Sequence, residues 1–257
     1  MRVLISSGHT LKGKGTGSVG YINEGTENRI LSNMVVKYLK KAGHEVDYYE
    51  INEGSDYLAK QVAKANSKNY DLVVQIHFNA FKLTDKAMGT ETYYISSKGK
   101  EFAQKINDKL STVFKDRGIK KSDGLYWLVN SKPVAVLVEA CFVDSKYDTD
   151  TYKINKELVG KLIAEGIHGD SIKDINTSNS KTFYRVVAGS FTKKSNAEAI
   201  VNDLKKYSYD AFISTFTKNN VLYYRAICGS YSLKANAEVQ KEKLKKYGYD
   251  AFIEVYQ

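Results

Sequence analysis

The stretch Val73-Val74-Gln75-Ile76-His77-Phe78-Asn79-Ala80 decides how the rest of the chain is interpreted. Its opening residues are apolar or well tolerated in strands, which predicts a short buried strand over residues 72–77. A histidine ends this strand, and a small polar segment then opens a loop. In an open α/β sheet, ligands bind just beyond the carboxyl ends of the strands. His77 therefore stands where a functional site is expected.

Three further residues occupy comparable positions. His9 follows the strand-like residues 2–6 and a glycine, and Glu24 follows a glycine-rich loop and opens a predicted helix. Glu139 ends the apolar run 135–138, where a carboxylate needs a partner or a chemical role. We interpret these three residues and His77 as one site.

Strands alternate with amphipathic helices through the first two thirds of the chain. This order predicts an α/β domain with a mostly parallel sheet flanked by helices. Ser55 is a plausible N-cap, Gly43 stands at a helix C-terminus, and Leu158, Leu162 and Ile163 are expected to point inward. The predicted strands are residues 2–6, 44–49, 72–77, 90–95, 125–129 and 134–139, and the predicted helices are residues 24–41, 56–66, 98–117 and 147–167.

The composition changes after residue 167, which predicts two domains. Residues 1–168 form the first, and the polar, proline-free residues 169–180 form a flexible linker. Within residues 181–257, Phe183-Tyr-Arg-Val-Val-Ala-Gly-Ser-Phe191 returns 40 residues later as Tyr223-Tyr-Arg-Ala-Ile-Cys-Gly-Ser-Tyr231. The residue pattern of each copy is typical of a strand followed by a helix and a second strand. The repeat therefore predicts a small α+β domain, a split-βαβ fold of the order βαββαβ with pseudo-twofold symmetry.

Charge and composition restrict the partners. The 257 residues carry a net charge of +10, which favours a polyanion such as nucleic acid, an anionic membrane or a bacterial wall. No apolar run approaches the roughly 20 residues that span a bilayer, so no membrane insertion is expected. The apolar run at Met1 is too short for a signal peptide, which predicts synthesis in the cytoplasm. Cys141 and Cys228 are expected to be buried and reduced.

The residue types at the site suit a catalytic metal. Zinc held by two imidazoles and one carboxylate keeps a fourth position open for catalysis. His9, Glu24 and His77 would supply these ligands for one zinc per chain, and Glu139 would transfer the proton. Two alternatives stay open at this point. A histidine at a strand end is often structural, and Glu27, one turn after Glu24, is a rival ligand.

Four motifs resemble those of the zinc-dependent N-acetylmuramoyl-L-alanine amidases of the amidase-3 group. They are Ile5-Ser-Ser-Gly-His9, Asn23-Glu24, Gln75-Ile-His77-Phe-Asn79-Ala80 and Val138-Glu139-Ala140, in the family's order. The resemblance covers residues 1 to about 168.

The resemblance implies that His9, Glu24 and His77 bind zinc, that Glu139 is catalytic, and that Glu24 is favoured over Glu27. The implied reaction cleaves the amide between muramic acid and L-alanine in peptidoglycan. Asn79 would either contact substrate or cap the turn after His77. The loop after His9 lacks the Asp-Pro-Gly-type segment of some members, which leaves the substrate contacts open.

The repeat has its own signature. Alternation places Phe183, Arg185, Tyr223 and Arg225 on one sheet face, which we expect to be the open one. The segments 189–191 and 196–198 resemble the SPOR (sporulation-related repeat) domain, which implies binding of peptidoglycan glycan strands through such residues. Many members carry a glutamine where residues 187 and 227 are Val and Ile, so the preferred glycan is open. The RNP1 pattern of RNA-binding domains is absent, so no nucleic acid partner is expected.

The leading hypothesis is a wall hydrolase, in which a zinc amidase is joined to a peptidoglycan-binding domain. A zinc peptidase and a catalytically inactive wall-binding protein are the alternatives. The hypothesis predicts action on the cell wall after holin-type release or mother-cell lysis, as an endolysin or an autolysin.

Overall fold

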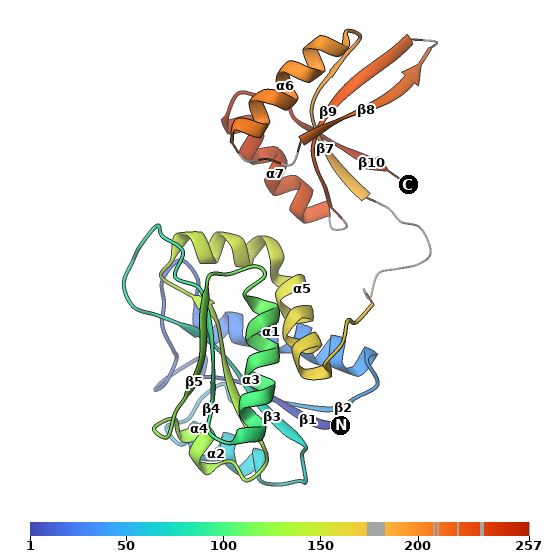
Figure 1. Ribbon diagram of the computed structural model, residues 1–257. Coiled ribbons are helices and arrows are strands. Elements are labelled where there is room, and N and C mark those ends of the chain that lie inside the picture. Colours follow the sequence, from blue (N-terminus) through green and yellow to red (C-terminus); the bar gives the residue numbers. More distant parts are fainter. Residues whose placement is uncertain (174–182, 208, 210, 220, 232–233, 257) are drawn as a thin grey trace. The chain divides into compact units, whose positions relative to one another are not determined.

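The structure is a computed structural model that describes residues 1–173, 183–207, 209, 211–219, 221–231 and 234–256. The chain divides into two compact units, Met1–Ile175 and Asn176–Gln257 (Figure 1).

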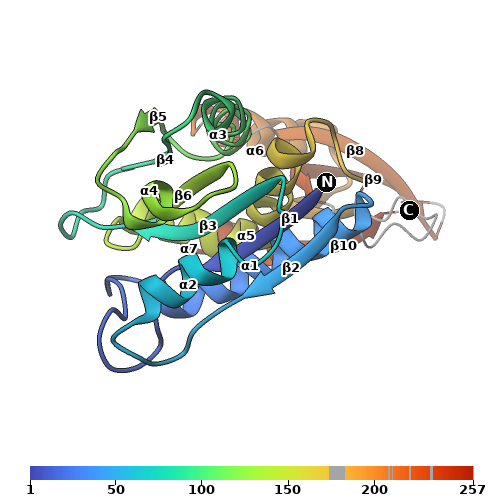
Figure 2. The ribbon, with the colours of Figure 1, turned by 90° about the horizontal axis from the view of Figure 1, so that it is seen from below.

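A mostly parallel sheet forms the centre of the first unit. Its strands within residues 1–173 are β1 (Arg2–Ser7), β2 (Glu45–Tyr49), β3 (Leu72–Asn79), β4 (Thr90–Tyr94), β5 (Asp116–Lys121) and β6 (Ala135–Phe142). The order across the sheet is β2-β1-β3-β6-β4-β5, and Figure 2 shows β2, β1 and β3 side by side. Neighbouring strands run parallel except β4 and β6, which pair antiparallel. The predicted fold class of this unit is confirmed.

Helices cover both faces of this sheet. They are α1 (Glu24–Lys41), α2 (Tyr57–Ala65), α3 (Ser97–Leu110), α4 (Tyr126–Asn130) and α5 (Lys146–His168). α1, α3 and α5 share one core with Val3 and Ile5, whereas α2 and α4 share a second core with Leu4. Consecutive strand residues point to opposite faces, so a strand covered on both sides is apolar throughout. This is why Val3, Leu4 and Ile5 are all apolar and fully buried.

The predicted helix over residues 24–41 is confirmed as α1. The side chain of Asn23 accepts a hydrogen bond from the N–H of Thr26 and caps the first turn. After the last turn, Gly43 has a φ of +82°, a conformation in which glycine has no steric cost. This cap places Glu24 at the first helical position.

The predicted helix over residues 98–117 is confirmed as far as Leu110 and wrong after it. α3 ends at Leu110, and the chain then turns and forms β5, which pairs with β4. The apolar pattern continues past the helix end because Val113 and Phe114 still pack against the same core. Periodicity by itself therefore does not reveal the turn.

Two other local predictions are also wrong. Residues 125–129, predicted as a strand, contain α4, in which Trp127 is buried and donates its indole N–H to the carbonyl oxygen of Val136. A short apolar run does not distinguish a buried strand from a buried helical turn. Ser55 is not an N-cap. The N-cap position of α2 is Asp56, and its side chain makes no capping hydrogen bond.

α5 agrees with its prediction except at one position. Leu162 and Ile163 are buried, but Leu158 is 36% exposed and does not point inward. The helical backbone is interrupted at Asn155, whose φ of −113° and ψ of +20° mark a kink before Leu158. The side chain that enters the core at this point is that of Val159, the next residue.

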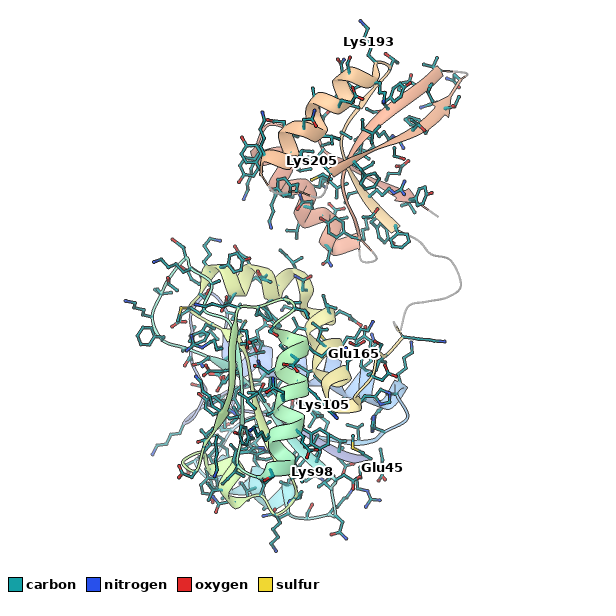
Figure 3. All side chains as sticks on the ribbon, in the orientation of Figure 1. Glu45, Lys98, Lys105, Glu165, Lys193 and Lys205 are labelled. Carbon is teal, nitrogen blue, oxygen red and sulfur yellow. The ribbon has the colours of Figure 1, made fainter. Side chains whose placement is uncertain are left out.

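Part of the predicted linker, residues 174–180, lies outside the described residues. Its first residues pack on α5. Gly169 ends that helix with a φ of +92°, and Ile172 is buried, with its N–H 3.0 Å from Oε1 of Glu165, a residue labelled in Figure 3. The predicted domain boundaries at 168 and 181 stay predictions.

The second unit has the predicted order βαββαβ. Its described elements are β7 (Phe183–Phe191), α6 (Lys194–Lys206), β8 (Ala211–Lys218), β9 (Val221–Tyr231), α7 (Lys234–Lys246) and β10 (Phe252–Tyr256). The strands form an antiparallel sheet in the order β10-β7-β9-β8. Both helices pack on one face, where Val186 and Ala188 of β7 meet Val201 and Leu204 of α6.

Cys141 and Cys228 are buried thiols, as predicted. Among the described residues, no helix is both long enough and apolar enough to cross a membrane.

Candidate metal and catalytic centre

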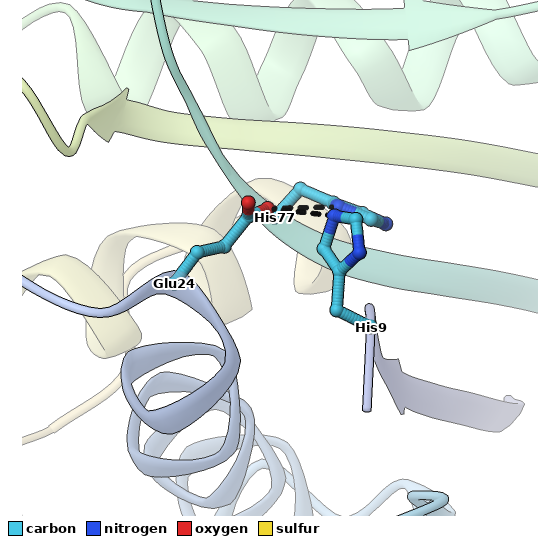
Figure 4. A group of neighbouring side chains, drawn as sticks. All are labelled: His9, Glu24 and His77. Atoms are coloured by element: carbon cyan, nitrogen blue, oxygen red, sulfur yellow. Dashed lines mark hydrogen bonds and ion pairs between the residues drawn. The ribbon is translucent and has the colours of Figure 1, made fainter. Parts of the chain in front are cut away.

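Three side chains from separate elements converge at the carboxyl edge of the parallel strands. His9 comes from the loop after β1, Glu24 from the first turn of α1, and His77 from near the end of β3 (Figure 4). Nε2 of His9 and Nδ1 of His77 lie 3.2 and 3.1 Å from the same atom, Oε1 of Glu24. One possible ligand atom of each residue lies within 4.8 Å of the other two. The three sequence-predicted ligands are therefore brought together.

The backbone of His9 adopts an uncommon conformation that aims its ring at the site. Its φ is +59°, in the left-handed region that a non-glycine residue rarely enters. Arg29 donates to the carbonyl oxygen of His9 at 3.2 Å, and Nδ1 of His9 lies 3.0 Å from the carbonyl oxygen of Gly15. These contacts leave Nε2 directed toward Glu24.

Glu24 is a buried carboxylate with a hydrogen bond on each oxygen. Oε1 accepts from the N–H of Phe78 at 3.1 Å, and Oε2 accepts from the N–H of Ser18 at 2.9 Å. Burial opposes ionisation, but the hydrogen bonds from His77 and His9 hold the pKa of Glu24 well below its usual value. The carboxylate is therefore ionised and fixed in orientation.

Glu27, the rival ligand, has other partners. Its carboxylate accepts from the hydroxyl of Tyr152 at 3.0 Å and from Nζ of Lys156 at 2.7 Å. The structure therefore brings Glu24, and not Glu27, to the two histidines.

Two glycines leave room for the ligands. A Cβ atom on Gly8 would lie 2.3 Å from the ring of His77. A Cβ atom on Gly17 would lie 2.7 Å from Oε2 of Glu24 and 3.0 Å from the ring of His9. The chain therefore forms a close cradle around two imidazoles and one carboxylate, the donor set of a catalytic zinc site.

Glu139 lies beside this cluster on the neighbouring strand. It is the register partner of His77 across the β3–β6 pairing. Its Oε2 atom is buried and has no hydrogen-bond partner among the described residues. Burial raises the pKa of Glu139 well above its usual value, and the negative charges of Glu24 and Glu91 raise it further. An acid with these properties is suited to exchanging a proton with a bound group.

The raised pKa predicts how pH affects the stability of the zinc-free protein. The protonated Glu139 side chain adds to the free energy of unfolding. This addition is fully present below the unfolded-state pKa of about 4.3 and is lost as pH rises through the folded-state pKa. Glu139→Gln stays neutral at every pH. The unfolding free energy of wild type relative to this variant should fall by about 1.4 kcal/mol for each pH unit between the two pKa values. Urea unfolding of both zinc-free proteins from about pH 4 to about pH 8 measures this. A difference that is independent of pH would contradict the prediction.

Glu91 is a second buried carboxylate near the site, and sequence reasoning missed it. It is the register partner of Glu139 across the β4–β6 pairing and is 2% exposed. Its Oε2 pairs with Nε of Arg117 at 2.6 Å and with Nζ of Lys120 at 2.5 Å. Burial opposes ionisation, but these cations lower the pKa of Glu91. An acidic residue inside the predicted strand 90–95 was the available signal, because a carboxylate between two sheet neighbours requires cations.

Asn79 is held by internal hydrogen bonds at both ends of its side chain. Its Nδ2 donates to Oε1 of Glu91 at 2.8 Å, and its Oδ1 accepts from the N–H of Ala80 at 2.8 Å. These contacts agree with the turn-capping alternative. A contact between Asn79 and substrate stays a prediction.

The residues predicted to bind the wall lie on the sheet face opposite the helices of the second unit. Phe183, Arg185, Tyr223 and Arg225 alternate with the residues that enter the helix-covered core. Among the described residues, the arginine face is therefore the one that the helices leave open, as expected. We call this face, with the aromatic residues of the neighbouring strands, the open sheet face. Its members are Phe183, Arg185, Phe212, Phe216, Tyr223, Arg225, Phe252 and Tyr256.

Aromatic rings and guanidinium groups interleave on the open sheet face. The guanidinium of Arg185 lies 3.4 Å from the ring centre of Tyr256, and that of Arg225 lies 3.5 Å from the ring centre of Phe216. Arg225 also pairs with Glu254. The aromatic residues on this face stay partly accessible, and Tyr256 is 45% exposed.

Comparison with known proteins assigns the family of the first unit. The family model described as N-acetylmuramoyl-L-alanine amidase matches residues 3–169. The chain belongs to this amidase family. A second family model, described as the SPOR domain, matches residues 156–215, a range that includes the first copy of the repeat.

Two curated relatives are longer than this member of the amidase family. An uncharacterized protein of Clostridium perfringens strain 13 is 36% identical over 213 residues, which are 79% of this chain and 61% of that protein. The probable autolysin PH of Staphylococcus aureus is 28% identical over 208 residues, which are 70% of this chain and 41% of that protein. The chain thus spans less than two thirds of the length of each.

Solved amidase structures resemble the first unit. The catalytic domain of the CD27L endolysin, described as targeting Clostridia Difficile, is 36% identical with a TM-score of 0.62, and the similarity covers 67% of this chain and 99% of that domain. The catalytic domain of CwlV, an N-acetylmuramoyl-L-alanine amidase of Bacillus (Paenibacillus) polymyxa, is 26% identical with a TM-score of 0.58, covering 66% and 97%. The fold and family of the first unit agree with the sequence prediction.

Proposed function

We propose that the chain is a zinc-dependent amidase that hydrolyses the bond between N-acetylmuramic acid and L-alanine in bacterial peptidoglycan. The observation that carries this proposal is the convergence of His9 and His77 on Glu24 beside the buried carboxyl group of Glu139. Membership of the amidase family supports the same reaction.

His9, Glu24 and His77 would hold the zinc ion. Two imidazole nitrogens and one carboxylate oxygen leave a coordination position open, as catalytic zinc sites require. When bound, zinc polarises a carbonyl group and lowers the pKa of water. The fixed orientations of the three side chains, described above, keep the donor atoms directed at one point.

Glu139 would act as the proton carrier of the reaction. Its carboxylate would take a proton from the attacking water and return it to the leaving amide nitrogen. The absence of a competing partner for Oε2 among the described residues supports this role. A pKa raised by burial supports it as well, because a carboxyl group with a raised pKa holds an accepted proton more readily than an ordinary one.

The second unit would anchor the enzyme to peptidoglycan glycan strands through the open sheet face. The SPOR match and the accessible aromatic and arginine side chains support this partner. An anchored enzyme meets its substrate at a raised effective concentration. We therefore propose the cell wall as the site of action, without a nucleic acid partner or insertion into a membrane.

The products formed from purified walls test the proposed reaction. The full zinc-loaded chain is incubated with purified sacculi. New N-terminal L-alanine and soluble stem peptide should then appear at the same rate. A zinc peptidase would instead release D-alanine or peptide fragments while the muramic acid amide stays intact. No release at all by folded, zinc-loaded protein would favour the inactive wall-binding alternative.

Loss of aromatic side chains from the open sheet face should weaken wall binding. In the full chain carrying Glu139→Gln, replacing both Phe183 and Tyr223 by Ala should lower affinity for purified sacculi by at least about tenfold, because buried aromatic contacts each contribute about 1 kcal/mol or more at interfaces. Co-sedimentation at fixed salt measures this.

The matched control for this experiment replaces Tyr207 and Tyr247 by Ala. These tyrosines are 59% and 63% exposed, but they follow the ends of α6 and α7 and stack on each other. We expect the control to bind sacculi normally. Equal binding by both double variants would exclude the open sheet face as the anchor.

A further inference from the structure

A chain of buried side-chain amides leads to His77. Oε1 of Gln75, on the same strand, lies 3.1 Å from Nε2 of His77. Nε2 of Gln75 donates at 2.9 Å to Oε1 of Gln61, which lies on α2. Nε2 of Gln61 donates at 2.7 Å to the backbone carbonyl oxygen of Ser7, at the end of β1. Gln61 and Gln75 are 0% and 2% exposed, so water does not compete for these bonds.

The backbone carbonyl group of Ser7 determines which group donates in each of these hydrogen bonds. The carbonyl oxygen of Ser7 can only accept a hydrogen bond, so Gln61 must turn its NH2 group toward it. The oxygen of Gln61 then faces Gln75, which must also present its NH2 group. The oxygen of Gln75 consequently faces His77, and it too can only accept. Nε2 of His77 therefore carries a proton. Nδ1 lies 3.1 Å from the carboxylate of Glu24, which also only accepts, so its lone pair becomes available when a metal ion takes the place of that contact.

We propose that Gln61 and Gln75 are positioning residues that select the Nε2–H tautomer of His77 and so present Nδ1 to the metal. Nδ1 is the nitrogen that faces Glu24. This inference rests on the proposed zinc site and specifies which atom of His77 serves it.

His9 has the opposite arrangement. Its Nδ1 lies against the carbonyl oxygen of Gly15, which can only accept, so Nδ1 carries the proton and Nε2 faces Glu24. The two histidines would therefore bind the metal through different ring nitrogens. In each, an acceptor behind the ring selects the tautomer, as is usual for metal-binding histidines.

Replacement of Gln75 tests the effect on metal affinity. Gln75→Leu removes the acceptor behind His77, and we expect zinc affinity of the full chain to fall about 10–100-fold. Gln75→Glu keeps an acceptor behind the ring and should lose less affinity. The matched control is Asn107→Leu, which removes a buried amide of α3 that bonds to Asp116 away from the site and should leave zinc affinity unchanged. Competition with a chromophoric chelator measures all of these affinities.

The tautomer itself is read in zinc-loaded protein. Two-bond ¹H–¹⁵N correlation spectra of histidine-labelled chain at about pH 8, where imidazole is mostly neutral, show which nitrogen is protonated. His77→Ala assigns the signals. We expect His77 to be protonated at Nε2 in wild type and in Gln75→Glu.

Protonation of His77 at Nδ1 in wild type would overturn the proposal, as would full zinc affinity in a folded Gln75→Leu variant. If that variant does not fold, the wild-type spectrum still decides. Neither readout depends on hydrolysis. Failure of the sacculus assay with His77 protonated at Nε2 would therefore refute the proposed function alone.

Discussion

Glu139→Gln is expected to lower the rate of muramic acid amide hydrolysis by at least about a hundredfold. General acid–base assistance is typically worth about 10²–10⁴ in rate, and a glutamine side chain cannot accept the proton. The substitution conserves the shape of the side chain, and Glu139 is not among the three residues whose donor atoms converge. Zinc content and wall binding should therefore be unchanged.

Zinc content, melting temperature and release of N-terminal L-alanine are to be measured on the same preparation. Glu27→Gln is the matched control, because it makes the same change at a carboxylate that is held by Tyr152 and Lys156. We expect this control to retain its zinc and its activity. Near-normal release of L-alanine by folded, zinc-loaded Glu139→Gln would assign proton transfer to another residue.

His77→Ala is expected to abolish zinc binding at micromolar metal and, with it, hydrolysis. Loss of an outer-shell partner typically costs about 10–100-fold in metal affinity, and loss of a direct ligand should cost more. The remaining carboxylate of Glu24 would also lose its partner at 3.1 Å. Elemental analysis after gel filtration should give one zinc per wild-type chain and close to none for the variant.

His168→Ala provides the matched control for ligand removal. His168 lies at the end of α5 with Nδ1 3.0 Å from Nε2 of His44, in a pair outside the site. The control should retain one zinc per chain. Full zinc in both His9→Ala and His77→Ala would eliminate the proposed site.

The proposed ligands were accessible from sequence because each has a distinctive local setting. His77 follows an apolar run, and Glu24 is the first residue after the cap Asn23. Parallel strands bring their carboxyl ends to one edge, so residues after β1 and β3 necessarily lie near each other. Local pattern and sheet topology together were enough to predict the cluster.

Local pattern was not enough at the far edge of the sheet. Residues 98–117 have an amphipathic pattern throughout, but the helix ends at Leu110 because the following segment gains a strand pairing with β4. A hydrogen-bonded edge and the burial of Phe114 outweigh helical propensity there. These contacts depend on residues that pattern analysis of the segment does not include.

The charge network around Glu91 shows the same limit. Its cations, Arg117 and Lys120, lie in the stretch that was predicted as helix and loop, so their approach to Glu91 could not be foreseen. The contact between Asn79 and Glu91 likewise requires β4 to lie beside β6. The residues that surround Glu139 could therefore not be predicted from the sequence.

The α/β class, the βαββαβ order of the repeat and the residues of the candidate site can all be predicted from the amino-acid sequence. Periodicity, repetition and residue type are local properties of the chain, which is why they suffice for these predictions. Which atoms of those residues meet depends on the folded structure. Nδ1 of His77 faces Glu24 because amides from α2 and β3 form a directed chain that begins at Ser7 on β1. The donor in one hydrogen bond determines the donor in the next only where the groups are in contact. Folding is what brings these groups into contact.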